Sequence, residues 1–206
     1  GTADALAGNF DISTNMSSLV VNGSLSVSGS LTANNGFIDV NGDVIVTSTG
    51  TLSAPSSDDS FFVSGNWTMT TGGTLLHNNS EVTFDDAGST TTFVGDTAFY
   101  DFTITTPSKM VFFTDGSNQT ILDDMTLTGA SGSEIVFRST GGGTFTQTFP
   151  NGAQFVQFVD VEDAIAATNP VNCFNCIDND PGSTTNWVFA SLSIIVPASG
   201  ETTDTT

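Results

Sequence analysis

Short runs of alternating apolar and polar residues, separated by glycine, fill the first half of the chain. The recurring unit is Gly-x-Φ-x-Φ, where Φ is apolar, and this spacing places both Φ side chains on one face of a strand. The pattern predicts one short strand and one corner per copy, with glycine supplying the tight corner. Copies begin at Gly23, Gly29, Gly36, Gly42, Gly50, Gly65 and Gly73.

The spacing of these copies favours a stacked fold. They recur every six to eight residues, with one gap of fifteen, which leaves little room for a meander of hairpins with strands of about five to six residues. A solenoid accommodates such units, because each coil stacks on the last and the Φ residues form a continuous core. We therefore expect an all-β fold, a β-solenoid (parallel β-helix-like) with an extra C-terminal strand. A β-sandwich of short strands is the alternative.

Longer strand-like runs follow in the second half, and prolines fall between them, where a missing N–H is harmless. The expected organisation has four segments. They are an N-terminal strand or cap (1–16), a short-repeat β-solenoid (17–105), a longer-repeat β region closed by a Cys-x-x-Cys loop (106–189), and a terminal strand with a polar tail (190–206).

Four motifs of the second half resemble a module repeated in large secreted bacterial surface proteins. They are Tyr100-Asp-Phe-Thr-Ile104, Ile135-Val-Phe-Arg-Ser-Thr-Gly141, Val159-Asp-Val-Glu-Asp-Ala164 and Asp180-Pro-Gly-Ser-Thr-Thr-Asn-Trp-Val-Phe189. The resemblance covers about residues 97–189 and rests on strand and turn patterns. It implies a β-helical, adhesin-like architecture, and it implies no catalytic activity.

The segment after this module is a strong strand signal followed by proline. It comprises Ser191, Leu192, Ser193, Ile194, Ile195 and Val196. A terminal strand of this kind pairs within its own subunit or completes a sheet edge on a neighbour, as in strand addition. Both alternatives remain open, and the second makes the segment a candidate assembly strand.

The charge balance excludes whole classes of function. Two basic residues, Lys109 and Arg138, stand against 22 acidic ones, for a net charge of −20. Nucleic-acid binding requires Lys and Arg to neutralise phosphates, so we expect none. No run approaches the roughly 18 apolar residues of a membrane span, so we expect no membrane insertion. Charged residues make up 12% of the chain, and the resulting neutral polar surface favours an extracellular, cell-surface location.

Cys173 and Cys176 form the only cysteine motif. A structural zinc site needs four ligands, and a redox Cys-x-x-Cys motif needs a βαβ context that this sequence lacks. We therefore expect a disulfide that pins the loop before Trp187, in agreement with an oxidising compartment.

The acidic clusters bear on metals and catalysis. Asp178 and Asp180 have alternating spacing and are a candidate calcium pair, because Ca²⁺ takes six to eight oxygen ligands. Plain solvated turns are the alternative interpretation. Adjacent Asp residues in a strand point to opposite faces, so they do not form the paired carboxylates of a glycosidase. We expect no enzyme, and no cofactor beyond a possible calcium ion.

Asn-x-Ser/Thr sequences provide candidate glycosylation sites, although several matches are expected by chance in a chain so rich in Ser, Thr and Asn. The acceptors are Asn15, Asn22, Asn66, Asn78 and Asn118.

These features predict a structural subunit of an extracellular self-assembling filament, sheath or surface layer, whose partners are copies of itself. The open-ended repeat favours head-to-tail stacking or donation of the terminal strand, since such contacts need not close. An adhesin or carbohydrate-binding module of a larger cell-surface protein, with glycans as partners, is the alternative.

Overall fold

The computed structural model describes residues 4–6, 8–12, 18–56 and 61–191. Within these residues the chain forms 26 β-strands and no helix. The strands form five sheets, and neighbouring strands in each sheet run parallel. The expectation of an all-β fold is confirmed. No helix of the described residues is long and apolar enough to cross a membrane.

The first side of the molecule is a single nine-stranded sheet, sheet A, that runs from one end to the other. Its strands are β1 (Asp4–Leu6), β4 (Leu25–Val27), β7 (Val44–Val46), β10 (Trp67–Met69), β13 (Thr91–Val94), β16 (Met110–Phe113), β19 (Ile135–Ser139), β22 (Val159–Val161) and β25 (Ile177–Asp178).

The other two sides each consist of two successive sheets. On the second side, sheet B holds β2 (Asn9–Asp11), β5 (Ser30–Asn34), β8 (Thr51–Pro55) and β11 (Thr74–Leu76), and sheet D holds β14 (Thr97–Phe99), β17 (Asn118–Ile121), β20 (Phe145–Thr148) and β23 (Ala164–Ala167). On the third side, sheet C holds β3 (Ser18–Val21), β6 (Phe37–Val40), β9 (Phe61–Val63), β12 (Glu81–Phe84), β15 (Asp101–Ile104) and β18 (Met125–Leu127), and sheet E holds β21 (Gln154–Gln157), β24 (Val171–Phe174) and β26 (Trp187–Ala190).

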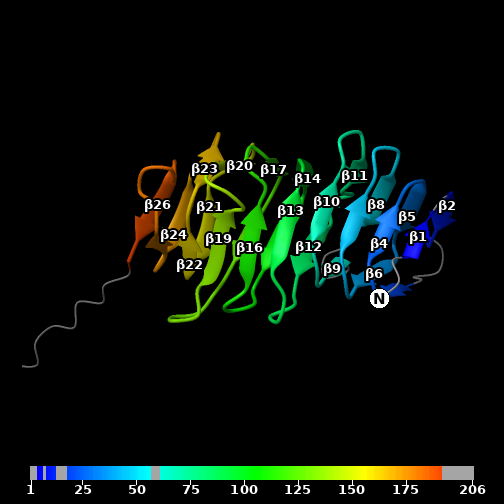
Figure 1. Cartoon of the computed structure of the whole chain (residues 1–206), viewed down its shortest axis with the longest axis horizontal. Coiled ribbons are helices and arrows are strands. Elements are labelled where there is room, and N and C mark those ends of the chain that lie inside the picture. Colours follow the sequence, from blue (N-terminus) through cyan, green and yellow to red (C-terminus); the bar gives the residue numbers. More distant parts are fainter. Residues whose placement is uncertain (1–3, 7, 13–17, 57–60, 192–206) are drawn as a thin grey trace, which may run out of the picture.

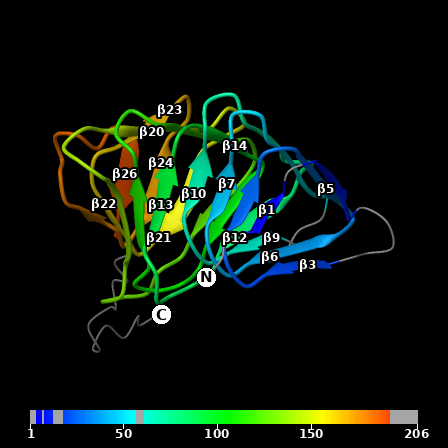
Figure 2. The ribbon, with the colours of Figure 1, turned by 45° about the vertical axis from the view of Figure 1, so that its right-hand side comes forward.

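Chain order visits the three sides in turn from β1 to β24, so each of these coils contributes one strand to each side. The result is a β-solenoid of about eight turns and not the alternative β-sandwich. Figure 1 shows the strands side by side along the long axis, from blue at the N-terminal end to red at the C-terminal end. Sheet A passes without interruption through the segments expected at 17–105 and 106–189, and Figure 2 shows the three sides obliquely.

The Φ positions of the repeat point into the solenoid. In six of the seven copies both Φ side chains are buried, as in Leu25 with Val27 and Val44 with Val46. Every third strand lies on the same side, because Leu25 of β4 pairs with Val44 of β7 and Val44 pairs with Trp67 of β10. One turn therefore consists of three sequence units, and its apolar rows form the continuous core.

The repeated glycines have a different role from the one expected. The N–H of Gly65 donates to the carbonyl oxygen of Gly42 on the preceding turn, at 3.0 Å. A Cβ at Gly65 would lie 2.6 Å from the carbonyl carbon of Gly42, and one at Gly42 would lie 2.7 Å from that of Gly23. Neither glycine has a positive φ. Close stacking of backbone on backbone, rather than a left-handed corner, thus excludes a side chain here.

Aromatic rings fill the middle of the core. Trp67, Phe93 and Phe113 occupy one inward row of sheet A, and the rings of Phe93 and Phe113 stack at 4.8 Å. Phe145 from sheet D stacks on Phe113 at 4.3 Å. The N–H of the Trp67 indole donates a 2.9 Å hydrogen bond to the Thr97 hydroxyl, which satisfies the one polar atom of this buried ring.

The second side has a seam between sheets B and D. β11 is the last strand of sheet B, β14 is the first strand of sheet D, and these two strands do not pair. At this edge the seventh copy departs from the pattern, since Leu75 and His77 are only half-buried. The His77 ring stacks instead on Tyr100, with ring centres 5.5 Å apart.

Candidate functional site

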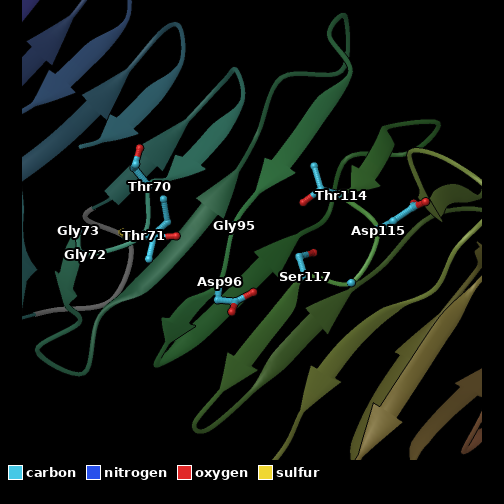
Figure 3. A pocket seen from close by; sticks show the side chains of 11 residues that line it. Thr70, Thr71, Gly72, Gly73, Gly95, Asp96, Thr114, Asp115 and Ser117 are labelled. Atoms are coloured by element: carbon cyan, nitrogen blue, oxygen red, sulfur yellow. The ribbon is translucent and has the colours of Figure 1, made fainter. Parts of the chain in front are cut away.

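The corner hollow is a cavity of about 430 Å³ beside the seam (Figure 3). Three stacked corners line it, namely those joining β10 to β11, β13 to β14 and β16 to β17. These corners are separated by about one turn of sequence, so no local motif indicated the hollow. Its polar lining includes Thr70, Asp96, Thr114 and Ser117.

Two of the polar groups at the hollow differ in what they can offer a ligand. The Asp115 carboxylate accepts hydrogen bonds from the N–H groups of Gly141 and Gly143, both at 3.1 Å, and it points away from the other labelled side chains (Figure 3). Ser117 is buried, and its hydroxyl has no hydrogen-bond partner. An unpaired buried hydroxyl is unfavourable, and this one lies in the wall of the hollow, shielded from solvent.

Cys173 and Cys176 lie at disulfide-bonding distance, with Cα atoms 5.6 Å apart. Cys173 is buried on the inward face of β24, and Cys176 lies in the corner that leads to β25. Asn175, between them in that corner, has a φ of 53°. The pair therefore ties sheet E to sheet A at the last complete turn, where fewer coils support the backbone.

The candidate assembly strand lies almost wholly outside the described residues. Ser191 is exposed and follows β26 directly, whereas Leu192, Ser193, Ile194, Ile195 and Val196 are not among the described residues. Its pairing, within the chain or with a neighbour, stays a prediction.

The candidate calcium residues sit in the last coil. Asp178 occupies the inward row next to Val161, and its Oδ1 is shielded from solvent without a hydrogen-bond partner. The carboxylate of Asp180 accepts from the N–H of Gly182 at 3.2 Å and from the Ser183 hydroxyl at 2.8 Å. Among the residues that the structure describes, no three His, Cys, Asp or Glu side chains are arranged to hold a metal ion.

The candidate glycosylation acceptors differ in exposure. Asn22 is exposed after β3, and Asn15 lies outside the described residues. The amide nitrogens of Asn66 and Asn78 donate to the preceding turn, to Asp43 Oδ1 at 2.9 Å and to the carbonyl oxygen of Ala54 at 2.7 Å. The side-chain oxygen of Asn118 accepts from the Thr148 hydroxyl at 3.0 Å. The side-chain oxygen of Asn22 also accepts from the Asn41 amide on the next turn, at 3.5 Å, so four of the five acceptors use their side chains to join turns.

Both basic residues are engaged with neighbouring turns. Arg138 on sheet A forms ion pairs of 2.8 Å with Asp160 and 3.1 Å with Glu162. Lys109 is buried, and burial lowers the pKa of its ammonium group, although Asp86 and Asp85 oppose this effect. The backbone N–H of Gly88 and the Ser89 hydroxyl lower the pKa of Asp86. Both cations thus join successive turns of the solenoid.

The two ends of the stack are the remaining candidate surfaces. At the N-terminal end Phe10 of β2 lies in the same inward row as Leu31 and Leu52, which are fully buried. Phe10 nevertheless exposes 41% of its surface. At the opposite end, β25, which has two residues, is the last strand of sheet A, and β26 is the last strand of sheet E. Each end thus presents strand edges, and the first one also presents part of the core.

Comparisons with protein-family models, curated proteins and solved structures found no match. The geometry itself defines the class: the chain is an all-β parallel β-solenoid of about eight turns. The architecture agrees with the β-helical module that the sequence motifs resemble.

Proposed function

We propose that this chain is a structural subunit of an extracellular self-assembling filament, sheath or surface layer, which assembles by head-to-tail stacking of solenoids. The observation that carries the proposal is the exposure of Phe10, a core-row residue, at the open N-terminal end. In every later turn of sheet B the corresponding side chain is covered on both sides or lies at the seam. A preceding coil from another copy would cover Phe10 as Phe10 covers Leu31.

The common direction of the strands supports a head-to-tail contact between copies, which can propagate without limit. Because all the sheets are parallel, the N-terminal coil of one copy has the same strand direction as the C-terminal coil of another. Addition of one end to the other would continue sheet A between copies. Such a heterologous contact propagates into a fibre unless rotation closes it into a ring. Donation of Ser191–Val196 to a neighbour is the other assembly route, and it needs the same open sheet edges.

Charge sets the conditions for this assembly. Each copy carries a net charge of −20, so free copies repel one another at low ionic strength. Screening shortens the range of the repulsion to about 10 Å at 0.1 M salt. We expect filaments at physiological salt and monomers in dilute buffer. The disulfide pair and the low density of charged residues support an extracellular location, and the proposal contains no catalytic step.

Electron microscopy and sedimentation of the purified chain at low and physiological salt test the proposal. The variant Phe10→Lys places a charge on the proposed contact and should abolish filaments. Val94→Lys is a matched control, because Val94 is 39% exposed on the outer side of sheet A, away from both ends. Both variants change the net charge equally. Monomers of the unmodified chain at every salt concentration, with intact β signal, would sink the proposal.

A glycan-binding module is the second candidate function, and the corner hollow favours it. The hollow is lined by the hydroxyl-bearing side chains of Thr70 and Thr114 and by the carboxylates of Asp96 and Asp115, a lining that suits the hydroxyls of a neutral sugar better than an anionic ligand. Screening of the monomer against a panel of glycans, with Thr114→Ala as the loss variant, tests this function. No binding by the unmodified chain would remove it.

A further inference from the structure

An exposed apolar patch covers the outer face of sheet E. It consists of Phe155 on β21, Phe174 on β24 and Val188 on β26, which expose 67%, 39% and 48% of their surfaces. The rings of Phe155 and Phe174 are nearly parallel, with an interplanar angle of 12° and centroids 6.5 Å apart. We call these three residues the C-terminal apolar patch. Exposed apolar groups that gather in this way mark contact surfaces more often than single exposed residues do.

Strand register places the three side chains on the same outward face, with Asn172 between Phe155 and Val188. Phe155 pairs with Asn172 and Asn172 pairs with Val188, so Phe155 and Val188 lie in one outward row across three strands. Phe174 lies two residues further along β24 and pairs with Ala190, which is also exposed. Three strands at about 4.8 Å spacing make the patch roughly 10 Å wide. Earlier on this side of the solenoid the outward positions of β15 and β18 hold Thr103 and Thr126 instead.

The chain leaves the described structure beside this patch. β26 ends at Ala190, in register with Phe174, and Leu192 follows two residues later. Four of the five residues from Leu192 to Val196 are apolar, and none is charged. Five extended residues span about 17 Å, which exceeds the width of the patch. The segment is therefore long enough, close enough and of the right chemistry to cover it.

We propose that Leu192–Val196 packs on the C-terminal apolar patch of its own chain. Tethering favours this occupant, because a segment joined to β26 through the single residue Ser191 has an effective concentration in the millimolar range at the patch. A second copy would have to reach that concentration in free solution. The inference does not rest on the proposed filament function. It assigns the terminal segment to its own subunit, so it leaves end-to-end stacking as the route of any assembly.

Limited proteolysis with chymotrypsin and elastase, followed by mass spectrometry, is the first test. The full chain should resist cleavage at Leu192–Val196, and the double variant Phe155→Ser, Phe174→Ser should lose the tail at least tenfold faster. Met110→Ser is the matched control, because Met110 is 44% exposed on sheet A, on another side of the solenoid. Equal cleavage rates in the full chain and the double variant would overturn the proposal.

Binding of the dye ANS by a chain truncated after Ser191 is the second test. Truncation should increase ANS fluorescence several-fold, and Phe155→Ser with Phe174→Ser should remove that increase. Far-UV circular dichroism establishes that the truncated chain keeps its β signal. Unchanged dye binding on truncation would overturn the proposal.

The dependence of tail protection on protein concentration shows whether the same chain or another copy supplies the segment that covers the patch. Protection of the tail should be constant over a hundredfold range of concentration in low salt, where the chain is monomeric by sedimentation. Protection that appears only as concentration rises would show that another copy supplies the segment, and the same-chain assignment would fail. Neither result bears on whether the solenoid ends stack, which Phe10→Lys tests separately.

Discussion

The ammonium group of Lys109 donates a hydrogen bond of 2.7 Å to the backbone carbonyl oxygen of Asp86, about one turn earlier in the chain. Lys109 has no solvent-exposed surface, and it is the only lysine of the chain. Lys109 lies in the corner that precedes β16, and its ammonium group thus provides a hydrogen-bond donor for a backbone carbonyl in the loop between β12 and β13. The contact joins two successive turns where sheet pairing does not.

Burial lowers the pKa of Lys109 in the folded protein below its ordinary value of 10.5. Between the lowered pKa and 10.5 the unfolded chain binds more protons than the folded one, so the free energy of unfolding should rise with pH across that interval. We expect the stability of the unmodified chain, relative to Lys109→Met, to increase as pH is raised towards 10.5. Urea unfolding at several pH values measures this difference, and a difference independent of pH would contradict the prediction.

The hydrogen bond between the Trp67 indole and Thr97 predicts a measurable coupling. Thr97→Val leaves the buried indole N–H without an acceptor, and Trp67→Phe removes the donor. Each variant should lower the free energy of unfolding by roughly 1–3 kcal/mol. In a double-mutant cycle the double variant should be more stable than the sum of the single effects predicts, by roughly 1 kcal/mol. Strict additivity in urea unfolding would contradict a direct interaction.

Gly95 should tolerate no side chain. It has a φ of 81°, and a Cβ there would lie 2.1 Å from the carbonyl oxygen of Met69. Gly95→Ala should therefore destabilise the fold by roughly 2 kcal/mol or more, through backbone strain and displacement of the β10–β11 corner. Gly142→Ala is the control, because no atom lies within 4 Å of its Cβ position and its φ is not positive. Thermal unfolding should separate the two variants by several degrees, and equal midpoints would contradict this account.

Loss of the disulfide between Cys173 and Cys176 should have a modest effect. The closed loop is short, with a sequence separation of 3, so the loop-closure model assigns it about 2 kcal/mol at most. Reduction with dithiothreitol, or the variant Cys176→Ser, should lower the urea midpoint slightly and leave the β signal intact. Cooperative unfolding on reduction alone would show a larger structural role.

The sequence predicted the strands best where glycine marks both ends of a unit. Alternation placed Leu25, Val27, Val44 and Val46 on the inward face, and all four are buried. It failed where a corner has no glycine. The run from Gln154 to Val161 suggests one long strand, but Phe158 has a φ of 53° and divides it into β21 and β22. Because a left-handed φ is rare in a residue other than glycine, asparagine or aspartate, nothing local indicated that corner.

The candidate surfaces were less accessible to sequence reasoning. Thr70, Asp96 and Ser117 come from three different turns and meet only because coils of unequal length stack in register. The outward position of Phe155 was equally hidden, since phenylalanine is among the residue types most often buried. The alternation in β21 places Gln154 and Val156 inside and leaves Phe155 outside.

The sequence by itself determined that the chain is built of short strands, which residues of each early strand face inward, and that the protein is strongly acidic. These properties depend on side-chain type and on the two-residue period of an extended backbone, which are local. The tertiary structure alone decided that three units make one turn, that Phe10 is left uncovered at an end, and that the seam opens between β11 and β14. These depend on the length of every corner and on which strand the next coil pairs with, and that pairing is settled by packing across the whole core.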